Sequence, residues 1–299
     1  MGRERLGFVG LGAMGAPLAR RLAGAGWPVA VLDRDPARAA ALSGVERISQ
    51  AADLGELERE ADILLTCLPS EKAVEEVAGA LGRPGLFLLD LSTIRPSTAR
   101  RLHGELARRG IHHVECPMLK GPLEAAEGTL FLVVSGEPGD IERIRPLLPV
   151  IGSEWRIVGG PGAASRIKTV QNGLGLVQLA AIAEALALVA ADGGELDSFI
   201  EVVGAGGGMA ATPLFRAKAP LMRERAPAAA GALRIGAKDS ALALGLAEEL
   251  GLDLPLFRRA AELFRAALGE GLGEADIAAI ARVVERETGI RIARSGAGG

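Results

Sequence analysis

The first half of the chain alternates short apolar runs with amphipathic stretches. Strands are predicted at Leu6–Val9, Val29–Leu32, Ile63–Leu68, Leu86–Leu91, His113–Cys116, Leu130–Val134 and Arg156–Val158. Helices are predicted at Met14–Ala25, Pro36–Leu42, Lys72–Leu81, Pro96–Arg109 and Gly139–Leu148. This alternation favours a parallel sheet that helices cover on both faces.

The second half lacks clear strand runs, and helical patterns dominate it. Helices are predicted at Ala163–Ala191, Asp197–Val203, Pro213–Arg223, Lys238–Leu250, Leu256–Leu268 and Glu274–Glu287. The change occurs at the GGPGAA stretch, which leads directly into the long helix. We therefore expect an α/β domain over residues 1–162, an all-helical domain over 163–287 and a flexible tail over 288–299.

The longest apolar segment, Leu174–Ala191, has about the length of a membrane span. It carries Gln178 and Glu184 and has no aromatic belt, so a buried central helix of a soluble protein is the better interpretation. The apolar residues Ile167, Val170 and Leu174 likewise suggest that the long helix is a mostly buried element.

Composition narrows the class of protein. The net charge of −3 gives no basic excess for nucleic acid or a membrane surface. Cys67 and Cys116 do not make a disulfide framework, which favours a reducing cytoplasm.

The first predicted strand runs into GLGAMG, which a helix follows. Gly10 permits a tight turn, Gly12 lets the backbone approach a pyrophosphate, and Gly15 lets helix and strand pack closely. The helix N-terminus offers N–H groups and a positive dipole to phosphates. The predicted cofactor loop comprises Gly10, Leu11, Gly12, Ala13, Met14 and Gly15.

Asp33 closes the second predicted strand, about 20 residues after the loop. Its carboxylate would accept hydrogen bonds from the adenosine ribose and repel a 2′-phosphate, which favours NAD. Arg34 could bind that phosphate, so NADP remains possible.

The long helix places Lys168 and Asn172 four residues apart, on one face. A lysine in an apolar helix needs a partner or a cavity, although it can also extend its ammonium to the surface. Because the helix starts where the two domains meet, a role in a substrate cleft is favoured.

Four segments resemble the beta-hydroxyacid dehydrogenase family, which includes 3-hydroxyisobutyrate dehydrogenase and tartronate semialdehyde reductase. They are GFVGLGAMGAPLARRLAGAGW, ECPMLKGPLEAAEGTL, GGPGAASRIKTVQN and GAKDSALAL. They occur in the family's order and spacing, and TCLPS and DLSTI support them.

The resemblance implies an N-terminal Rossmann domain and an all-helical C-terminal domain joined by the long helix. It implies NAD(P)-dependent hydride transfer at the alcohol or aldehyde carbon of a small acidic hydroxy compound. Family members assemble as dimers or tetramers, so a homodimer or homotetramer is implied. Neither a metal ion nor nucleic acid or membrane binding is expected.

The resemblance also assigns roles to residues. Lys168 would be the general acid/base, and Asn172 would orient Lys168 or the substrate. Leu68, Pro69 and Thr93 would line the path from adenosine to nicotinamide, and Lys238 would reach the cofactor from the second domain.

The substrate loop departs from the family pattern. Where relatives have a serine and two glycines that hold the substrate carboxylate, this chain has Leu119, Lys120 and Gly121. Three interpretations of Lys120 stay open: it binds a substrate anion such as a sulfonate, it pairs with Glu124, or it points to solvent.

Besides a sulfonated-aldehyde reductase on the same fold, two further alternatives concern the whole protein. Imine-reducing relatives share the architecture, but they usually replace the lysine that this chain has at position 168. A catalytically silent NAD-binding relative is the second alternative, and the presence of both Lys168 and Asn172 argues against it.

Overall fold

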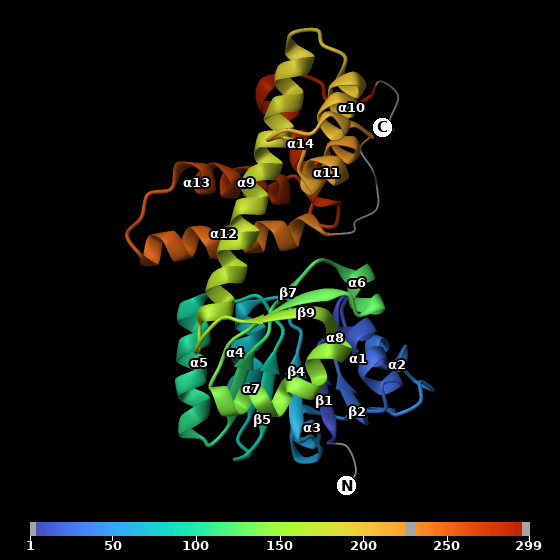
Figure 1. The fold of residues 1–299 in the computed structure, drawn as a ribbon, viewed down its shortest axis with the longest axis vertical. Helices are drawn as coiled ribbons and strands as arrows, with labels where there is room; N and C mark the ends of the chain where they lie inside the picture. The colour runs from blue at the N-terminus through green and yellow to red at the C-terminus, as the bar shows by residue number, and fades with distance from the viewer. Residues whose placement is uncertain (1–3, 225–230, 295–299) are drawn as a thin grey trace. The chain divides into compact units, whose positions relative to one another are not determined.

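The computed structural model describes residues 4–224 and 231–294. The chain divides into two compact units, Met1–Thr169 and Val170–Gly299, here called the N-terminal unit and the helical unit. The expected fold class is confirmed, because an α/β unit precedes an all-helical one (Figure 1). The boundary predicted at residues 162–163 falls at the start of the long helix, and the division by contacts falls inside that helix.

The main sheet of the N-terminal unit has six parallel strands in the order β3-β2-β1-β4-β5-β6. The strands are β1 (Leu6–Val9), β2 (Val29–Leu32), β3 (Ile48–Gln50), β4 (Ile63–Thr66), β5 (Phe87–Asp90) and β6 (His112–Glu115). The order reverses between β1 and β4, and doubly wound sheets bind ligands at such a switch point, at the carboxyl ends of the strands.

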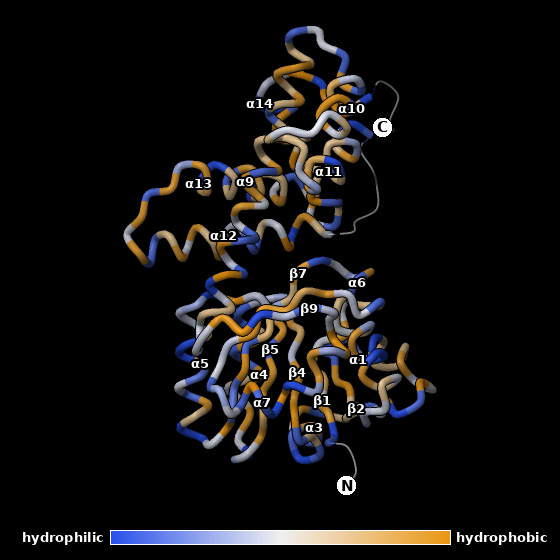
Figure 2. Tube along the Cα trace, in the orientation of Figure 1, coloured by the Kyte–Doolittle hydropathy of each residue, from blue (hydrophilic) through white to orange (hydrophobic). Residues whose placement is uncertain are grey.

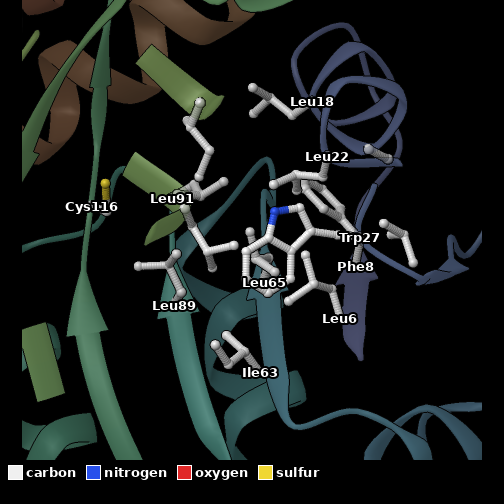
Figure 3. Packing of buried hydrophobic residues seen from close by; sticks show 14 of the residues in the cluster. Leu6, Phe8, Leu18, Leu22, Trp27, Ile63, Leu65, Leu89, Leu91 and Cys116 are labelled. Carbon is white, nitrogen blue, oxygen red and sulfur yellow. The ribbon is translucent and has the colours of Figure 1, made fainter. Parts of the chain in front are cut away.

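The strands are apolar because the sheet is buried on both faces. One core cluster contains Phe8, Leu65 and Leu89, and Figure 3 shows these side chains packing with Leu18, Leu22 and Trp27. Leu64 and Leu88, the neighbours of Leu65 and Leu89, belong to a second cluster. Figure 2 shows mainly apolar residues along the central strands, whereas α5 carries both hydrophilic and apolar residues.

Eight α-helices accompany the sheets in the described part of the N-terminal unit before the long helix. They are α1 (Gly15–Gly24), α2 (Pro36–Ala40), α3 (Leu54–Glu60), α4 (Glu71–Ala80), α5 (Pro96–Arg108), α6 (Pro122–Glu127), α7 (Pro138–Ile144) and α8 (Leu148–Ile151), with a 3₁₀ turn at Arg145–Leu147 between the last two. Local caps start several of them: the side chain of Asp35 accepts the N–H of Ala37, and Ser70 accepts that of Ala73. The sequence patterns missed β3 and α3, which are short and only partly buried.

The last strands do not join the parallel sheet that the sequence predicts. β7 (Met118–Leu119), β8 (Leu130–Val134) and β9 (Gly152–Ile157) form a separate three-stranded sheet. β7 runs antiparallel to β8, whereas β9 runs parallel to it. The expectation of one sheet was wrong because strand pairing is a non-local property that apolar runs do not specify.

The long helix α9 (Ala163–Ala191) has 29 residues and is apolar enough to cross a membrane by length and composition alone. Its core face includes Leu179, Ala183 and Leu186, which pack inside the helical unit. The residues that suggested a mostly buried element do not themselves support that expectation, since Ile167, Val170 and Leu174 are 42%, 47% and 52% exposed. They follow a 3–4 spacing along one face, which differs from the face that packs in the core.

The rest of the helical unit consists of helices. They are α10 (Leu196–Gly206), α11 (Pro213–Glu224), α12 (Leu233–Glu249), α13 (Pro255–Gly269) and α14 (Ile280–Thr288), with a 3₁₀ turn at Ile277–Ala279. The glycine-rich run Gly204–Gly208 is divided: its first part forms the last turn of α10, and the loop begins only after Gly206. Packing continues beyond the predicted end at residue 287, since Ile292 is fully buried; the predicted tail residues 295–299 lie outside the described residues.

Leucines concentrate on the segment that joins α12 to α13. Leu250, Leu252, Leu254 and Leu256 are 64%, 52%, 36% and 70% exposed. A cluster of exposed apolar side chains on a surface is typical of an interaction site.

Buried ionisable groups lie near the end of β6. His113 is buried, and neither ring nitrogen finds a hydrogen-bond partner among the described residues. Burial lowers the pKa of His113 below its usual 6.5, although the carboxylates of Asp90 and Glu115 act in the opposite direction. The ring is therefore neutral in the folded protein at neutral pH.

We expect His113 to make the protein less stable in mild acid. As the pH falls below about 6.5 the unfolded chain binds a proton at this ring before the folded chain does, so the free energy of unfolding falls by up to ~1.4 kcal/mol per pH unit. Chemical denaturation of wild type and His113→Leu between pH 7.5 and 5 should show a shallower decline in the variant. The matched control is His112→Gln, which removes a half-buried histidine one residue away; an unchanged slope in His113→Leu would contradict the assignment.

Candidate functional site

The loops that follow β1 and β4 meet at the switch point of the main sheet. Gly10 has a φ of +95°, and a Cβ built there would lie 2.4 Å from the carbonyl oxygen of Cys67. A Cβ on Gly15 would lie 1.9 Å from the carbonyl oxygen of Gly10. Only glycine fits either position, so the tight turn and close packing expected from the sequence are present.

Gly12 differs from these two glycines. A Cβ there would meet only the guanidinium of Arg38, at 3.8 Å. The fold itself therefore leaves space above Gly12, and Met14 at the start of α1 supplies no side-chain cap. An uncapped helix N-terminus beside an open glycine fits the pyrophosphate of a dinucleotide.

Asp33 lies directly after β2, and its carboxylate faces this loop. Oδ2 accepts the N–H of Leu11 at 2.6 Å, and Oδ1 accepts the N–H of Asp35 at 2.9 Å. Arg34 is exposed, whereas Arg38 places its guanidinium 3.8 Å from Asp33. The sequence thus missed Arg38 as the nearer cation, because it lies on α2 rather than beside the acidic residue.

Leu68, Pro69 and Thr93 lie in the loops that follow β4 and β5. Leu68 donates its N–H to Oγ of Ser92 at 3.0 Å, and the N–H of Ser92 in turn binds the carboxylate of Asp90 at 3.0 Å. Leu68 and Thr93 are half-buried, while Pro69 is exposed. These bonds hold the two loops together at the carboxyl edge of the sheet.

Lys168 lies in the second turn of α9 and is half-buried. Its neighbour Thr169 places Oγ1 3.4 Å from the carbonyl oxygen of Ile94, one residue after Thr93. This part of α9 therefore lies beside the loop after β5, within the N-terminal unit.

The substrate-loop candidates Leu119, Lys120 and Gly121 run from the end of β7 to the start of α6. Lys120 has a φ of +78°, a left-handed conformation that usually requires glycine. The backbone at Lys120 thus has a conformation that is typical of glycine. Nζ of Lys120 donates a hydrogen bond to the carbonyl oxygen of Thr129, so the exposed side chain bridges the two ends of α6.

Glu124, on α6, binds the backbone of the same loop. Oε2 accepts the N–H of Gly121 at 3.0 Å. Hydrogen bonds from the N–H groups of Glu124 itself and of Gly121 lower the pKa of the Glu124 carboxyl, and Lys120 adds a smaller electrostatic contribution. The N–H of Gly121 therefore already has an anionic partner from the chain.

Asn172 and Lys238 come together in the helical unit through a third residue. Nδ2 of Asn172 on α9 donates to Oδ2 of Asp239 on α12 at 2.7 Å. Nζ of Lys238 lies 3.0 Å from Oδ1 of Asp239, an ion pair without good hydrogen-bond geometry. Asp239 is buried; sequence reasoning missed it, although the Lys-Asp pair in GAKDSALAL was a visible signal.

Gly173, next to Asn172, explains how α9 approaches its neighbours so closely. A Cβ there would lie 2.5 Å from the ring of Phe257 and 2.7 Å from Cβ of Ala243. A side chain at this position would push α9 away from α12 and α13.

Comparison with known proteins agrees with this geometry. Residues 5–160 match the family described as the NAD binding domain of 6-phosphogluconate dehydrogenase. Residues 162–284 match the family described as the NAD-binding segment of NADP-dependent 3-hydroxyisobutyrate dehydrogenase. The chain belongs to the beta-hydroxyacid dehydrogenase family. It is thus an NAD(P)-dependent dehydrogenase or reductase by family.

Two curated relatives span nearly the whole chain. A 2-(hydroxymethyl)glutarate dehydrogenase from Eubacterium barkeri is 32% identical, over 96% of this chain and 97% of that protein. A 3-sulfolactaldehyde reductase from Escherichia coli is 28% identical, over 95% and 97%. Among solved structures, Mycobacterium tuberculosis 3-hydroxyisobutyrate dehydrogenase with L-serine superposes with a TM-score of 0.81 at 26% identity, over 95% of this chain and 99% of that one.

The position of Asp33 predicts which cofactor binds more tightly. Asp33→Asn removes the charge that would repel a 2′-phosphate and keeps one acceptor oxygen for the N–H of Leu11. We expect the Kd for NADPH relative to that for NADH to fall by at least about tenfold, or ~1.4 kcal/mol.

Fluorescence titration with both reduced cofactors measures this ratio without a substrate. The matched control is Asp35→Asn, which alters a carboxylate two residues away that caps α2. An equal change in both variants would show that local charge, rather than contact with the ribose, sets the preference.

Proposed function

We propose that the protein oxidises the hydroxymethyl or secondary alcohol group of a small hydroxy acid that carries a second anionic group, or reduces the corresponding aldehyde or ketone. NAD is the proposed preferred cofactor, and Lys168 is the proposed general acid/base. The observation that supports this most directly is that α9 carries Lys168 beside the loop after β5 and, four residues later, Asn172 with its amide fixed by Asp239.

The proposed roles follow from the atoms that these side chains present. In oxidation, neutral Nζ of Lys168 takes the proton of the substrate hydroxyl, and in reduction the ammonium returns it to the developing alkoxide. Because Nδ2 of Asn172 binds Asp239, Oδ1 is oriented as an acceptor for Lys168 or for the substrate hydroxyl. The bound nicotinamide would supply or take up the hydride at the same carbon.

The cofactor would be held by the N-terminal unit. The loop Gly10–Gly15 and the N-terminus of α1 fit its pyrophosphate, and Asp33 fits the adenosine ribose. Leu68, Pro69 and Thr93 would line the nicotinamide side, and Lys238 would contribute from the helical unit. Asp33 favours NAD because two backbone N–H groups hold its carboxylate in place.

The loop and two relatives support the proposed substrate class. 2-(Hydroxymethyl)glutarate is a dicarboxylate and 3-sulfolactaldehyde carries a sulfonate, so both names describe substrates with a strong anion. Lys120 uses one of its three N–H donors on Thr129, which leaves donors for an anion. We therefore propose that Lys120 binds the substrate's acidic end, with Leu119 packing against its carbon chain.

Cytoplasmic location and homo-oligomeric assembly complete the proposal. Both cysteines are free thiols, as expected in a reducing compartment. Assembly through the helical unit would cover Leu250, Leu252, Leu254 and Leu256. Sedimentation velocity tests the assembly, since a mass of 30.8 kDa would identify a monomer.

The role of Lys168 is tested with two substitutions. Lys168→Ala should lower kcat by at least about a hundredfold and leave the Kd for NADH within twofold, because it removes only proton transfer. Lys168→Arg keeps the positive charge but cannot act as a base, so it should be nearly as slow.

Turnover is measured with NAD and NADP on 2-(hydroxymethyl)glutarate, 3-hydroxyisobutyrate, L-serine and 3-sulfolactaldehyde. The control is Lys72→Ala on the surface of α4, where the side chain is 84% exposed. Wild-type kcat in Lys168→Ala would remove Lys168 from the mechanism.

Charge and backbone strain at Lys120 can be separated with two variants. Lys120→Gly and Lys120→Ala both remove the ammonium, so both should raise KM for 2-(hydroxymethyl)glutarate by at least about tenfold, as for loss of a charge-assisted hydrogen bond. Only glycine tolerates a φ of +78° without strain, so the glycine variant should be about 1 kcal/mol more stable than the alanine variant.

Kinetics and thermal denaturation of the same preparations give both quantities. L-serine, which lacks a second acid group, serves as the comparison substrate, and its KM should change less than about threefold. A small effect that is equal on both substrates would count against an anion contact.

A further inference from the structure

Helix α9 begins without a capping residue of its own. The stretch Gly159–Ala164 reads GGPGAA and contains no Ser, Thr, Asp or Asn. The first N–H groups of a helix lack partners within the helix, and leaving them buried and unpaired is costly. These groups must therefore be satisfied from elsewhere in the fold.

Glu115, at the end of β6, supplies the missing partner. Its side chain is buried, at 2% exposure. Oε1 accepts the N–H of Gly162, and Oε2 accepts the N–H of Ser165 at 3.1 Å together with the hydroxyl of Ser165. A carboxylate at this end of a helix also interacts favourably with the positive end of the helix dipole.

Ser135 extends the same arrangement. Its Oγ accepts the N–H of Ala164 at 3.0 Å and donates to Oε1 of Glu115 at 3.2 Å. The backbones of Ser135 and Glu115 exchange two hydrogen bonds of 2.9 Å. The helix start, at Gly162, Ala164 and Ser165, is thus attached to two residues, one at the end of β6 and one directly after β8.

The approach of this segment to α5 adds a steric restraint. Gly162 has a φ of +86°, and a Cβ there would lie 2.8 Å from Cγ of Arg100 and 3.2 Å from the carbonyl oxygen of Pro96. The turn before α9 therefore has little freedom to shift.

Lys168 lies one helical turn after Ser165 and directly before Thr169. Glu115 fixes Ser165, and the contact of Thr169 with Ile94 fixes the following turn. We propose that Glu115 is a positioning residue that sets the place and rotation of the turn bearing Lys168. This inference rests on the proposed role of Lys168 as general acid/base.

The chemistry of the carboxylate makes the inference testable. Each of its two oxygens accepts a backbone N–H, so an amide of the same shape must turn its NH₂ group toward one of these donors. Glu115→Gln therefore loses one bond and creates a donor–donor contact. Glu115→Asp keeps two acceptor oxygens on a shorter side chain and should restore much of the function.

The matched control is Glu58→Gln. Oε1 of Glu58 also accepts two backbone N–H groups, those of Gly82 and Arg83, both at 2.6 Å. This pair precedes β5, at the amino edge of the sheet, opposite the candidate site. The control thus makes the same chemical change to a carboxylate that caps backbone groups elsewhere.

The experiment compares wild type, Glu115→Gln, Glu115→Asp, Ser165→Ala, Glu58→Gln and Lys168→Ala. Amide hydrogen exchange of peptides covering residues 162–169 measures the stability of the start of α9. Titration with NADH measures cofactor binding. The kinetic constants kcat and KM are measured on the panel substrate that wild type turns over fastest. In Glu115→Gln we expect exchange to rise and kcat to fall, each by at least about tenfold, with the Kd for NADH within twofold.

Ser165→Ala removes only a hydroxyl and provides a variant that folds if Glu115→Gln does not. It should fall between wild type and Glu115→Gln in both exchange and kcat. Glu115→Asp should recover at least half of the decrease in log kcat that Glu115→Gln shows. Glu58→Gln should leave both kcat and the hydrogen exchange over residues 162–169 unchanged.

The outcomes distinguish this inference from the proposed function. If kcat is low in Lys168→Ala but equal to wild type in a folded Glu115→Gln, only the positioning role of Glu115 is overturned. Unchanged hydrogen exchange over residues 162–169 in Glu115→Gln would overturn it as well. Wild-type kcat in Lys168→Ala would overturn the proposed function, and the positioning role with it. A fall in stability without a fall in kcat would reduce Glu115 to a purely structural residue.

Discussion

The buried carboxylate of Glu115 makes the interaction that attaches the start of α9 to the N-terminal unit. Glu115 replaces a local cap with one that lies 47 residues from Gly162 in the sequence. A local serine or aspartate would have capped the helix without fixing it to anything else. A cap from the end of β6 instead attaches the helix start to the sheet that also carries the loop Gly10–Gly15. One carboxylate therefore both stabilises the start of α9 and fixes its position relative to that sheet.

The residues expected to bind the cofactor show how much of a site local sequence can specify. The spacing from Gly10 to Gly15 and on to Asp33 lies within one strand–helix–strand unit. The backbone of that unit alone determines which of its residues lie next to each other. Glu115 and Asp239 could not be assigned in this way. Each acts on a partner 47 to 67 residues away, and that pairing depends on how β6 or α12 packs against α9. The same reason explains why the separate sheet β7-β8-β9 was expected to join the parallel one.

In the helical unit, too, a buried carboxylate, that of Asp239, needs partners from other parts of the fold. Asp239 is buried on α12, and an unpaired carboxylate there would be costly. Lys238 provides charge compensation, and the amide of Asn172 provides a hydrogen bond. Close approach of the helices through Gly173 is what brings Asn172 within reach. The glycine beside the asparagine therefore supports this network, although it carries no functional group.

The proposed substrate loop carries two opposite charges, Lys120 and Glu124, and their positions bear on the proposed substrate class. Glu124 occupies the N–H of Gly121, so a substrate carboxylate that uses this group must displace a carboxylate of lowered pKa. Lys120 instead retains donors beyond its bond to Thr129 and is held in a strained conformation, which is rarely kept without a reason. An anion therefore gains most by approaching Lys120 and avoiding Glu124. This arrangement supports the proposed substrate class, in which the second acid group lies some carbons from the reacting alcohol, over a compact monocarboxylate.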